Sequence, residues 1–189
     1  MADNHTQDLI QSVSNAETWR TLYPYTKMDL PVIEVKDMAK KYTDQIHDEV
    51  KNITGEIFGI NTKTEAIELR PRNWKEPHLL LYQRLENRPD YLGTEIHYDG
   101  CDITWSAMLS RLDEYEGGGT YFPCLRKTIK LRQGQVLIHP GKLYHKGCEI
   151  TMGVRTLLLS FTDGMNPKIV DGSTSADDAS EYEKNVIIM

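Results

Sequence analysis

Apolar residues recur at intervals of three and four between residues 32 and 57, with charged residues between them. The recurring positions are Val35, Met38, Tyr42, Ile46, Val50 and Ile53. This spacing matches the 3.6-residue turn of an amphipathic helix. The pattern therefore predicts a helix over 32–57 whose apolar stripe packs against a sheet.

After this helix the pattern changes to short apolar or alternating runs, which indicate strands. The predicted strands cover 65–70, 79–85, 103–112, 135–140 and 154–161. Three consecutive glycines at 117–119 mark a tight turn or bulge where backbones approach closely. We therefore expect a chain that is mainly β with flanking helices.

Three regions follow from these patterns. Residues 1–31 form an N-terminal extension, with a loop between its two prolines. Residues 32–163 form one domain, made of the helix over 32–57 and a β core over 65–163, which suits a chain of 189 residues. Residues 164–189 form a polar tail whose apolar end is expected to dock on the domain or on a partner.

A histidine and an aspartate lie two positions apart in the segment 94–99, which reads as extended. Residues two apart on an extended segment point to the same side, so His97 and Asp99 can reach one metal ion. His145 follows the strand predicted over 135–140. Two histidines and one carboxylate on one face of an Fe(II) ion leave its other positions open. This set is typical of non-haem iron oxygenases.

Arg155 lies in the strand over 154–161, on the face that carries Leu157, Leu159 and Phe161. A buried charge without a partner is costly, so an arginine among large apolar residues needs an anionic partner. An arginine also holds a carboxylate well, through two parallel hydrogen bonds. We therefore expect Arg155 to bind a carboxylate co-substrate.

Each of these features has an ordinary explanation when it is taken alone. A histidine two positions before an aspartate arises by chance in many chains, His145 could be a surface residue, and Arg155 could belong to a structural ion pair. The order, spacing and strand context together favour the metal and carboxylate interpretation.

Four blocks resemble the catalytic domain of the procollagen lysyl hydroxylases, within the prolyl and lysyl hydroxylase group. They are HYDG at 97–100, YEGGGTYF at 115–122, HPGKLYHKG at 139–147 and TMGVRTLLLSF at 151–161. The resemblance extends over about 79–163. It implies a double-stranded β-helix (jelly-roll) core, iron on His97, Asp99 and His145, and 2-oxoglutarate bound by Arg155.

The same resemblance implies an Fe(II)- and 2-oxoglutarate-dependent dioxygenase that uses O2, hydroxylates an unactivated C–H bond and releases succinate and CO2. It also implies ascorbate for sustained activity. The expected substrate is a lysyl or prolyl side chain in a peptide, and a free amino acid or small metabolite is the alternative. From other classes, the alternatives are a non-catalytic jelly-roll binding module and a zinc hydrolase. The complete set of ligands and Arg155 speak against the binding module. A zinc hydrolase would use the same three ligands, but it would leave Arg155 and the four blocks unexplained.

Further site residues follow from the resemblance. Tyr82 matches a family tyrosine near the co-substrate, with a core aromatic as the alternative, and Thr104 is a second candidate for cofactor binding. His139 falls on a family position that does not ligate metal, so strand-end hydrogen bonding is expected for it. Ser106 stands where similar enzymes tend to carry an asparagine. The segment 87–93 is a candidate substrate lid, with an ordinary surface connection as the alternative.

Composition narrows the partners. The net charge is −6 and no basic stripe is present, which argues against nucleic-acid binding. No apolar run approaches the ~20 residues that span a bilayer, so no membrane partner is expected. The polar start lacks the layout of a secretory signal, and Cys101, Cys124 and Cys148 form no even framework. Reduced thiols and a cytoplasmic location are therefore expected, while the oligomeric state has no signal in the sequence.

Overall fold

The computed structural model describes residues 27–31, 44–46, 48–50, 52–53, 70–72, 76–83, 92–164 and 186–189. The strands are β1 (Lys27–Pro31), β2 (Arg70–Pro71), β3 (His78–Gln83), β4 (Ile103–Met108), β5 (Tyr115–Gly117), β6 (Thr120–Phe122), β7 (Lys127–Ile129), β8 (Val136–Pro140), β9 (Lys146–Gly147), β10 (Ile150–Asp163) and β11 (Ile187–Ile188). Residues 44–46, 48–50 and 52–53 are helical.

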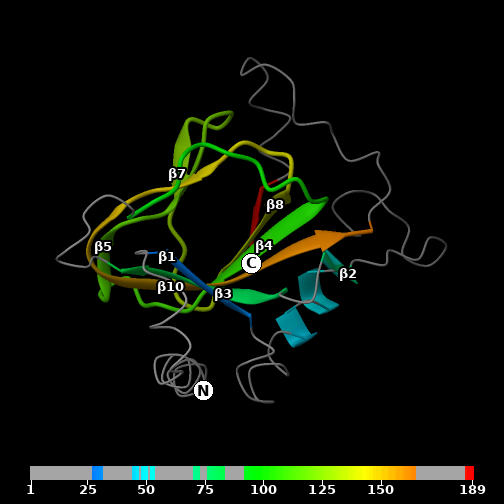
Figure 1. The fold of residues 1–189 in the computed structure, drawn as a ribbon, viewed down its shortest axis with the longest axis horizontal. Coiled ribbons are helices and arrows are strands. Elements are labelled where there is room, and N and C mark those ends of the chain that lie inside the picture. The colour runs from blue at the N-terminus through cyan, green and yellow to red at the C-terminus, as the bar shows by residue number, and fades with distance from the viewer. Residues whose placement is uncertain are drawn as a thin grey trace.

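The strands form two antiparallel sheets (Figure 1). The main sheet has the order β1-β3-β10-β4-β8-β11, with β2 and β5 also paired to β10, and the second sheet has the order β7-β6-β9. Residues of β3, β4, β8 and β10 of the main sheet and of β6 and β9 of the second sheet line one cavity. Two sheets that enclose a cavity form the jelly-roll core expected from the resemblance, so the predicted fold class is confirmed.

Both faces of the main sheet are buried, and alternation along the strands assigns a different content to each. On one face Leu80, Tyr82 and Leu157 line the cavity. On the other face Trp105 and Ile138 have no exposed surface. The two-residue period of these strands therefore separates the cavity wall from a second buried face, which carries Trp105 and Ile138 together with hydroxyl side chains such as Thr156.

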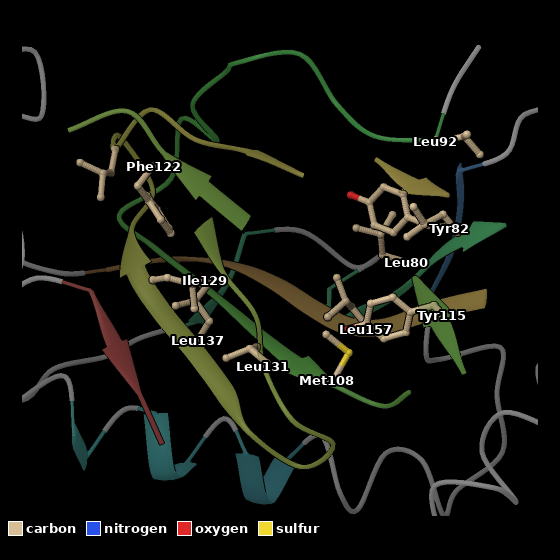
Figure 2. Close-up of a cluster of buried hydrophobic side chains, with 12 residues drawn as sticks. Leu80, Tyr82, Leu92, Met108, Tyr115, Phe122, Ile129, Leu131, Leu137 and Leu157 are labelled. Atoms are coloured by element: carbon tan, nitrogen blue, oxygen red, sulfur yellow. The ribbon is translucent and has the colours of Figure 1, made fainter. Parts of the chain in front are cut away.

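A hydrophobic cluster extends from the cavity to the second sheet (Figure 2). Phe122 lies at one end of the cluster, and Tyr82 and Tyr115 lie at the other end, with Leu157 beside Tyr115. The cluster includes residues of β3, β4, β5, β6, β8 and β10. These contacts hold the two sheets together and keep the strands that form the cavity in a fixed arrangement.

The helix predicted over 32–57 agrees with the structure where that range is described. Val50 is fully buried, Ile46 and Ile53 are half-buried, and the intervening Asp48 and Glu49 are exposed. This is the burial pattern of an amphipathic helix. None of the helices in the described ranges is long and apolar enough to cross a membrane.

Most strand boundaries in the described ranges lie within two residues of those predicted, and the two largest differences concern β4 and β10. β4 ends at Met108, before the predicted end at residue 112, because a turn follows in which Glu114 N donates to Arg111 O at 3.2 Å. β10 begins at Ile150, before the predicted start at residue 154. The glycine within β10, Gly153, has a φ of 81°. A Cβ there would lie 2.0 Å from Glu114 O, so only glycine allows β10 to approach the backbone of residue 114 this closely.

Both ends of the described chain join the main sheet. Residues 27–31, expected to be part of a loop in an N-terminal extension, form β1 and pair with β3, so the loop prediction is wrong there. Ile187 and Ile188, at the end of the predicted tail, pair with Ile138 and Leu137 of β8. These apolar residues thus dock on the domain, where pairing satisfies backbone groups at a sheet edge. The division at residues 31 and 163 otherwise stays a prediction.

Candidate metal and co-substrate site

The extended segment 94–99 pairs with the chain around residue 145. His97 N donates to His145 O and His145 N donates to His97 O, each at 2.9 Å. Thr94 N also donates to Gly147 O at 2.9 Å, and Asp99 N donates to Gly141 O at 2.8 Å. Residues directly opposite in an antiparallel pair point to the same face, so the backbone itself brings the two histidines together.

The three residues predicted as metal ligands converge. One possible ligand atom from each of His97, Asp99 and His145 lies within 4.8 Å of the other two. Nε2 of His97 is 3.5 Å from Oδ1 of Asp99, and Nε2 of His145 is 3.6 Å from Oδ2. The side chain of Asp99 is 4% exposed. The structure therefore places one carboxylate between two imidazoles, at the wall of the cavity.

Backbone carbonyls hold both imidazoles in place. Nδ1 of His97 is 2.7 Å from Glu95 O, and Nδ1 of His145 is 2.9 Å from Leu143 O. A carbonyl accepts only, so each Nδ1 carries the proton and donates it. Each Nε2 then keeps its lone pair on the cavity side, which is the form of imidazole that binds a metal.

Two further side chains hold Asp99. The hydroxyl of Thr104 donates to Oδ2 of Asp99 at 2.5 Å, and Nη1 of Arg72 donates to its backbone carbonyl at 2.9 Å. Thr104, predicted as a co-substrate contact, thus bonds to a predicted metal ligand, although it also lines the cavity. Arg72 is missing from the sequence prediction, because nothing in its local sequence links it to residue 99.

Protonation states suit a cation. Burial by itself would raise the pKa of Asp99, but the hydrogen bond with His97 and the fields of His145 and His139 lower it overall. Burial lowers the pKa of His145, with Asp99 acting in the opposite direction. At neutral pH the pair is therefore a carboxylate beside a neutral imidazole, as metal ligation requires.

The remaining histidine of the cavity, His139, is not one of the three converging groups. Its ring lies 4.6 Å from that of His145, and its Nδ1 is 2.9 Å from Pro140 O. Burial lowers its pKa to about 4. This neutral, hydrogen-bonded residue agrees with the expectation of a non-ligating histidine at a strand end.

Arg155 lines the same cavity as the three converging residues. The residue is 2% exposed and makes no ion pair with the described residues. Its Nε and Nη1 have no hydrogen-bond partner within that part of the chain. Leu157, Leu159 and Phe161 line the cavity with it, so the predicted face of β10 is confirmed. A buried, unpaired guanidinium fits an anionic ligand.

Tyr82 flanks this arginine. The guanidinium carbon of Arg155 lies 5.2 Å from the centre of the Tyr82 ring, within cation–π range. The Tyr82 hydroxyl packs against the backbone of Gly147, where a Cβ would come within 2.6 Å of it. Glycine at 147 is therefore needed for the hydroxyl to reach the cavity. Gly147 N also donates to the hydroxyl of Thr94 at 2.7 Å.

Several residues that line the cavity were not predicted as site residues. Thr94 and Thr120 add hydroxyls to the cavity wall, and Leu80 adds apolar surface. Ser106, the residue that differs from the asparagine implied by the family resemblance, also lines the cavity. The candidate lid over 87–93 lies outside the described residues except for its last two positions.

The residues present fit both an iron ion and a dicarboxylic co-substrate. Two imidazole nitrogens and a carboxylate on one side match the donor set of non-haem Fe(II), and the cavity leaves the other side open. Arg155 supplies a carboxylate site in the same cavity. The thiols of Cys101, Cys124 and Cys148 are free and are not among the converging groups.

Comparisons with curated proteins give relatives in one group. The chain is 31% identical over 149 residues to "Multifunctional procollagen lysine hydroxylase and glycosyltransferase LH3" of Rattus norvegicus, covering 71% of this chain and 18% of that protein. It is 39% identical over 71 residues to "Procollagen-lysine,2-oxoglutarate 5-dioxygenase 1" of Homo sapiens, covering 35% of this chain and 10% of that protein. The chain thus matches less than a fifth of the length of these relatives. No protein-family model matches it.

Solved structures with the same fold include two prolyl hydroxylases. The viral collagen prolyl hydroxylase of Paramecium Bursaria Chlorella virus-1, in its 2OG complex, has a TM-score of 0.55 and 15% identity, over 88% of this chain and 92% of that one. A prolyl hydroxylase from Trichoplax adhaerens, bound to a hypoxia inducible factor peptide, has a TM-score of 0.55 and 14% identity, over 85% and 79%. The expected resemblance to the prolyl and lysyl hydroxylase group is confirmed.

Proposed function

We propose that this chain, a relative of the procollagen lysine hydroxylases with the fold of 2OG-Fe(II) oxygenases, is an Fe(II)- and 2-oxoglutarate-dependent dioxygenase. The observation that carries the proposal is the convergence of His97, Asp99 and His145 on the cavity that also holds the unpaired Arg155. A metal site alone would also suit a zinc hydrolase, and the buried arginine is what favours a carboxylate co-substrate.

The proposed substrate is a lysyl or prolyl side chain in a peptide. The curated relatives are named as procollagen lysine hydroxylases, and a structural neighbour was solved with a peptide bound. Both support a peptide over a free amino acid, which stays the alternative. A non-catalytic binding module is the alternative of another class, and it would give no reaction to a cavity that combines three metal-ligand groups with Arg155.

Each site residue has a distinct role in this proposal. His97, Asp99 and His145 would hold the iron, and Arg155 would bind the distal carboxylate of 2-oxoglutarate. When bound, iron and 2-oxoglutarate together supply O2 activation, in which one oxygen atom enters the substrate C–H bond, the other enters succinate, and CO2 leaves.

The protein's own contribution is positioning and the exclusion of water. The backbone bonds at Nδ1 fix both imidazoles, and the hydroxyl of Thr104 orients the carboxylate of Asp99. Leu80, Leu157 and Leu159 make much of the remaining wall apolar. An apolar wall strengthens the attraction between Arg155 and a carboxylate, because the local dielectric constant is lower than in water.

The direct test incubates the protein with Fe(II), 2-oxoglutarate, O2 and ascorbate, together with lysine- and proline-containing peptides or free amino acids. The expected result is a peptide product heavier by one oxygen atom and an equal amount of succinate. Omission of ascorbate should shorten the productive phase. A protein that binds Fe(II) and 2-oxoglutarate but yields neither product nor succinate with any substrate would support the binding-module alternative.

A further inference from the structure

Tyr115 lies beside Arg155 but is not one of the residues that line the cavity. It begins β5, where it is paired with Gly153 of β10. Arg155 is two residues further along β10, and residues two apart on a strand share a face. Tyr115 and Arg155 are therefore diagonal neighbours on the inner face of the main sheet. In Figure 2 the Tyr115 ring lies beside Leu157, at the same end of the cluster as Tyr82.

Gly118, in the glycine segment 117–119, lies close to the side chains of both Tyr115 and Arg155. A Cβ at Gly118 would lie 3.1 Å from Cε2 of Tyr115 and 3.2 Å from Cδ of Arg155. Gly118 also has a φ of 64°, which a side chain rarely adopts. The ring of Tyr115 and the stem of Arg155 thus both pack against Gly118, where a side chain would displace them.

Polar atoms of both residues lack partners. The hydroxyl of Tyr115 and two nitrogens of Arg155, Nε and Nη1, are sealed from solvent and have no hydrogen-bond partner among the described residues. A buried polar group left unpaired costs about 1–3 kcal/mol. Burial raises the pKa of Tyr115, and the nearby positive charge of Arg155 acts against this rise. The hydroxyl and the guanidinium therefore lie close enough to influence each other.

We propose that Tyr115 is a positioning residue for the co-substrate. When a carboxylate in the cavity binds the guanidinium of Arg155, another N–H of that guanidinium donates a hydrogen bond to the hydroxyl oxygen of Tyr115. Together with the Tyr82 ring, this contact sets how far the guanidinium extends toward the three metal ligands. That distance selects the chain length of the dicarboxylic acid. The inference rests on the proposed function, because it assumes that Arg155 receives a carboxylate.

The test is the variant Tyr115→Phe, which removes one oxygen atom. Since this hydroxyl has no partner in the structure, its loss should leave the melting temperature unchanged or slightly raised. Binding of 2-oxoglutarate is measured by calorimetry, with redox-inert Mn(II) in place of Fe(II), so that no turnover occurs. The expected result is a dissociation constant raised about tenfold, which corresponds to about 1.4 kcal/mol.

A chain-length series sharpens the test. Oxaloacetate is one carbon shorter than 2-oxoglutarate, and 2-oxoadipate is one carbon longer. The wild-type protein should prefer 2-oxoglutarate. Tyr115→Phe should reduce that preference, because the guanidinium of Arg155 is no longer held at a fixed distance from the metal ligands. Tyr144→Phe is the matched control, since Tyr144 is 47% exposed. This control should bind all three acids as the wild type does.

Four outcomes would overturn the inference, and they differ in what else they affect. Unchanged affinity in Tyr115→Phe would remove Tyr115 from co-substrate binding and leave the proposed function intact. A lower melting temperature alongside the weaker binding, or an equal loss for all three acids, would make the residue structural. A wild-type protein that binds Mn(II) but no 2-oxoglutarate would overturn the inference and the proposed function together.

Discussion

The two ends of the cavity differ in how fully their polar groups are bonded. At the metal end, Nδ1 of both histidines and the carboxylate of Asp99 all have hydrogen-bond partners within the chain. At the other end, two nitrogens of Arg155 and the hydroxyl of Tyr115 have none among the described residues. The backbone organises the metal end before any ligand binds, whereas the arginine end leaves donors free for the proposed carboxylate.

This difference has a physical origin. Backbone groups of the paired segments around residues 97 and 145 must find partners in any case, and that pairing orients the histidines at no further cost. A side chain that must bind a carboxylate cannot have its donors occupied by the protein itself. Unpaired polar groups at a ligand site thus destabilise the ligand-free form and favour binding.

The largest effect is expected from removing a ligand at the metal end. His145→Ala deletes one of three converging groups, so turnover should fall to background while the fold persists, because backbone bonds hold this segment. Product formation and circular dichroism measure the two effects. Lys142→Ala, an exposed change in the same turn, is the control. Wild-type activity in His145→Ala would exclude this residue from the site.

Lowering the pH should reduce the free energy of unfolding of the metal-free protein, because of a buried histidine at the metal end. The pKa of His139 is lowered to about 4 from the ordinary 6.5, so the unfolded chain takes up a proton that the folded chain does not. Stability is therefore lost as the pH falls from about 6.5 toward about 4. Between about pH 7 and pH 5 the wild type should lose about 2 kcal/mol more than His139→Leu.

Urea unfolding at the two pH values, with a chelator present, gives these free energies. His145, whose pKa is also lowered, contributes in the same direction and is present in both proteins. Their difference therefore reports the titration of His139 together with its electrostatic influence on His145 and Asp99. An equal loss in the wild type and in His139→Leu would contradict the assignment of a buried neutral imidazole at this position.

At the arginine end, Arg155→Lys keeps the charge but loses the planar pair of donors. The apparent KM for 2-oxoglutarate should rise tenfold or more, which corresponds to about 1.4 kcal/mol or more. Steady-state kinetics at saturating peptide measure this change, with Arg132→Lys at an exposed position as the control. An unchanged KM would place the carboxylate elsewhere in the cavity.

The smallest effect is expected from Thr104→Val, which removes the hydrogen bond to Asp99 and keeps the shape of the side chain. The dissociation constant for Fe(II) should rise about fivefold, or about 1 kcal/mol, with little change in the KM for 2-oxoglutarate. Anaerobic metal titration measures it, and Thr128→Val at an exposed position is the control. A rise in the KM alone would return Thr104 to the role of co-substrate contact.

Local sequence patterns predicted which segments form strands and which residues face the cavity better than they predicted where the strands begin and end. Alternation along 154–161 correctly placed Arg155, Leu157 and Leu159 on the cavity face. It could not show that β10 begins at Ile150, because Gly153 has no side chain to contribute to the pattern. Nor could it show that β4 ends at Met108, where hydrogen bonds of the following turn replace the ladder.

The sequence by itself determined which residues can perform the chemistry. His97 and Asp99 are two apart on an extended segment, so their shared direction follows from backbone geometry alone. His145 follows a predicted strand, and Arg155 shares a strand face with large apolar residues, so both were candidates before the family resemblance supported them.

Only the tertiary structure decided what surrounds these residues. Arg72 and Thr104 reach Asp99, and Tyr115 and Gly118 pack against Arg155, through strand pairings that join distant parts of the chain. No local period encodes such contacts, because a hydrogen bond or a close approach between two strands depends on register and on the packing of both sheets.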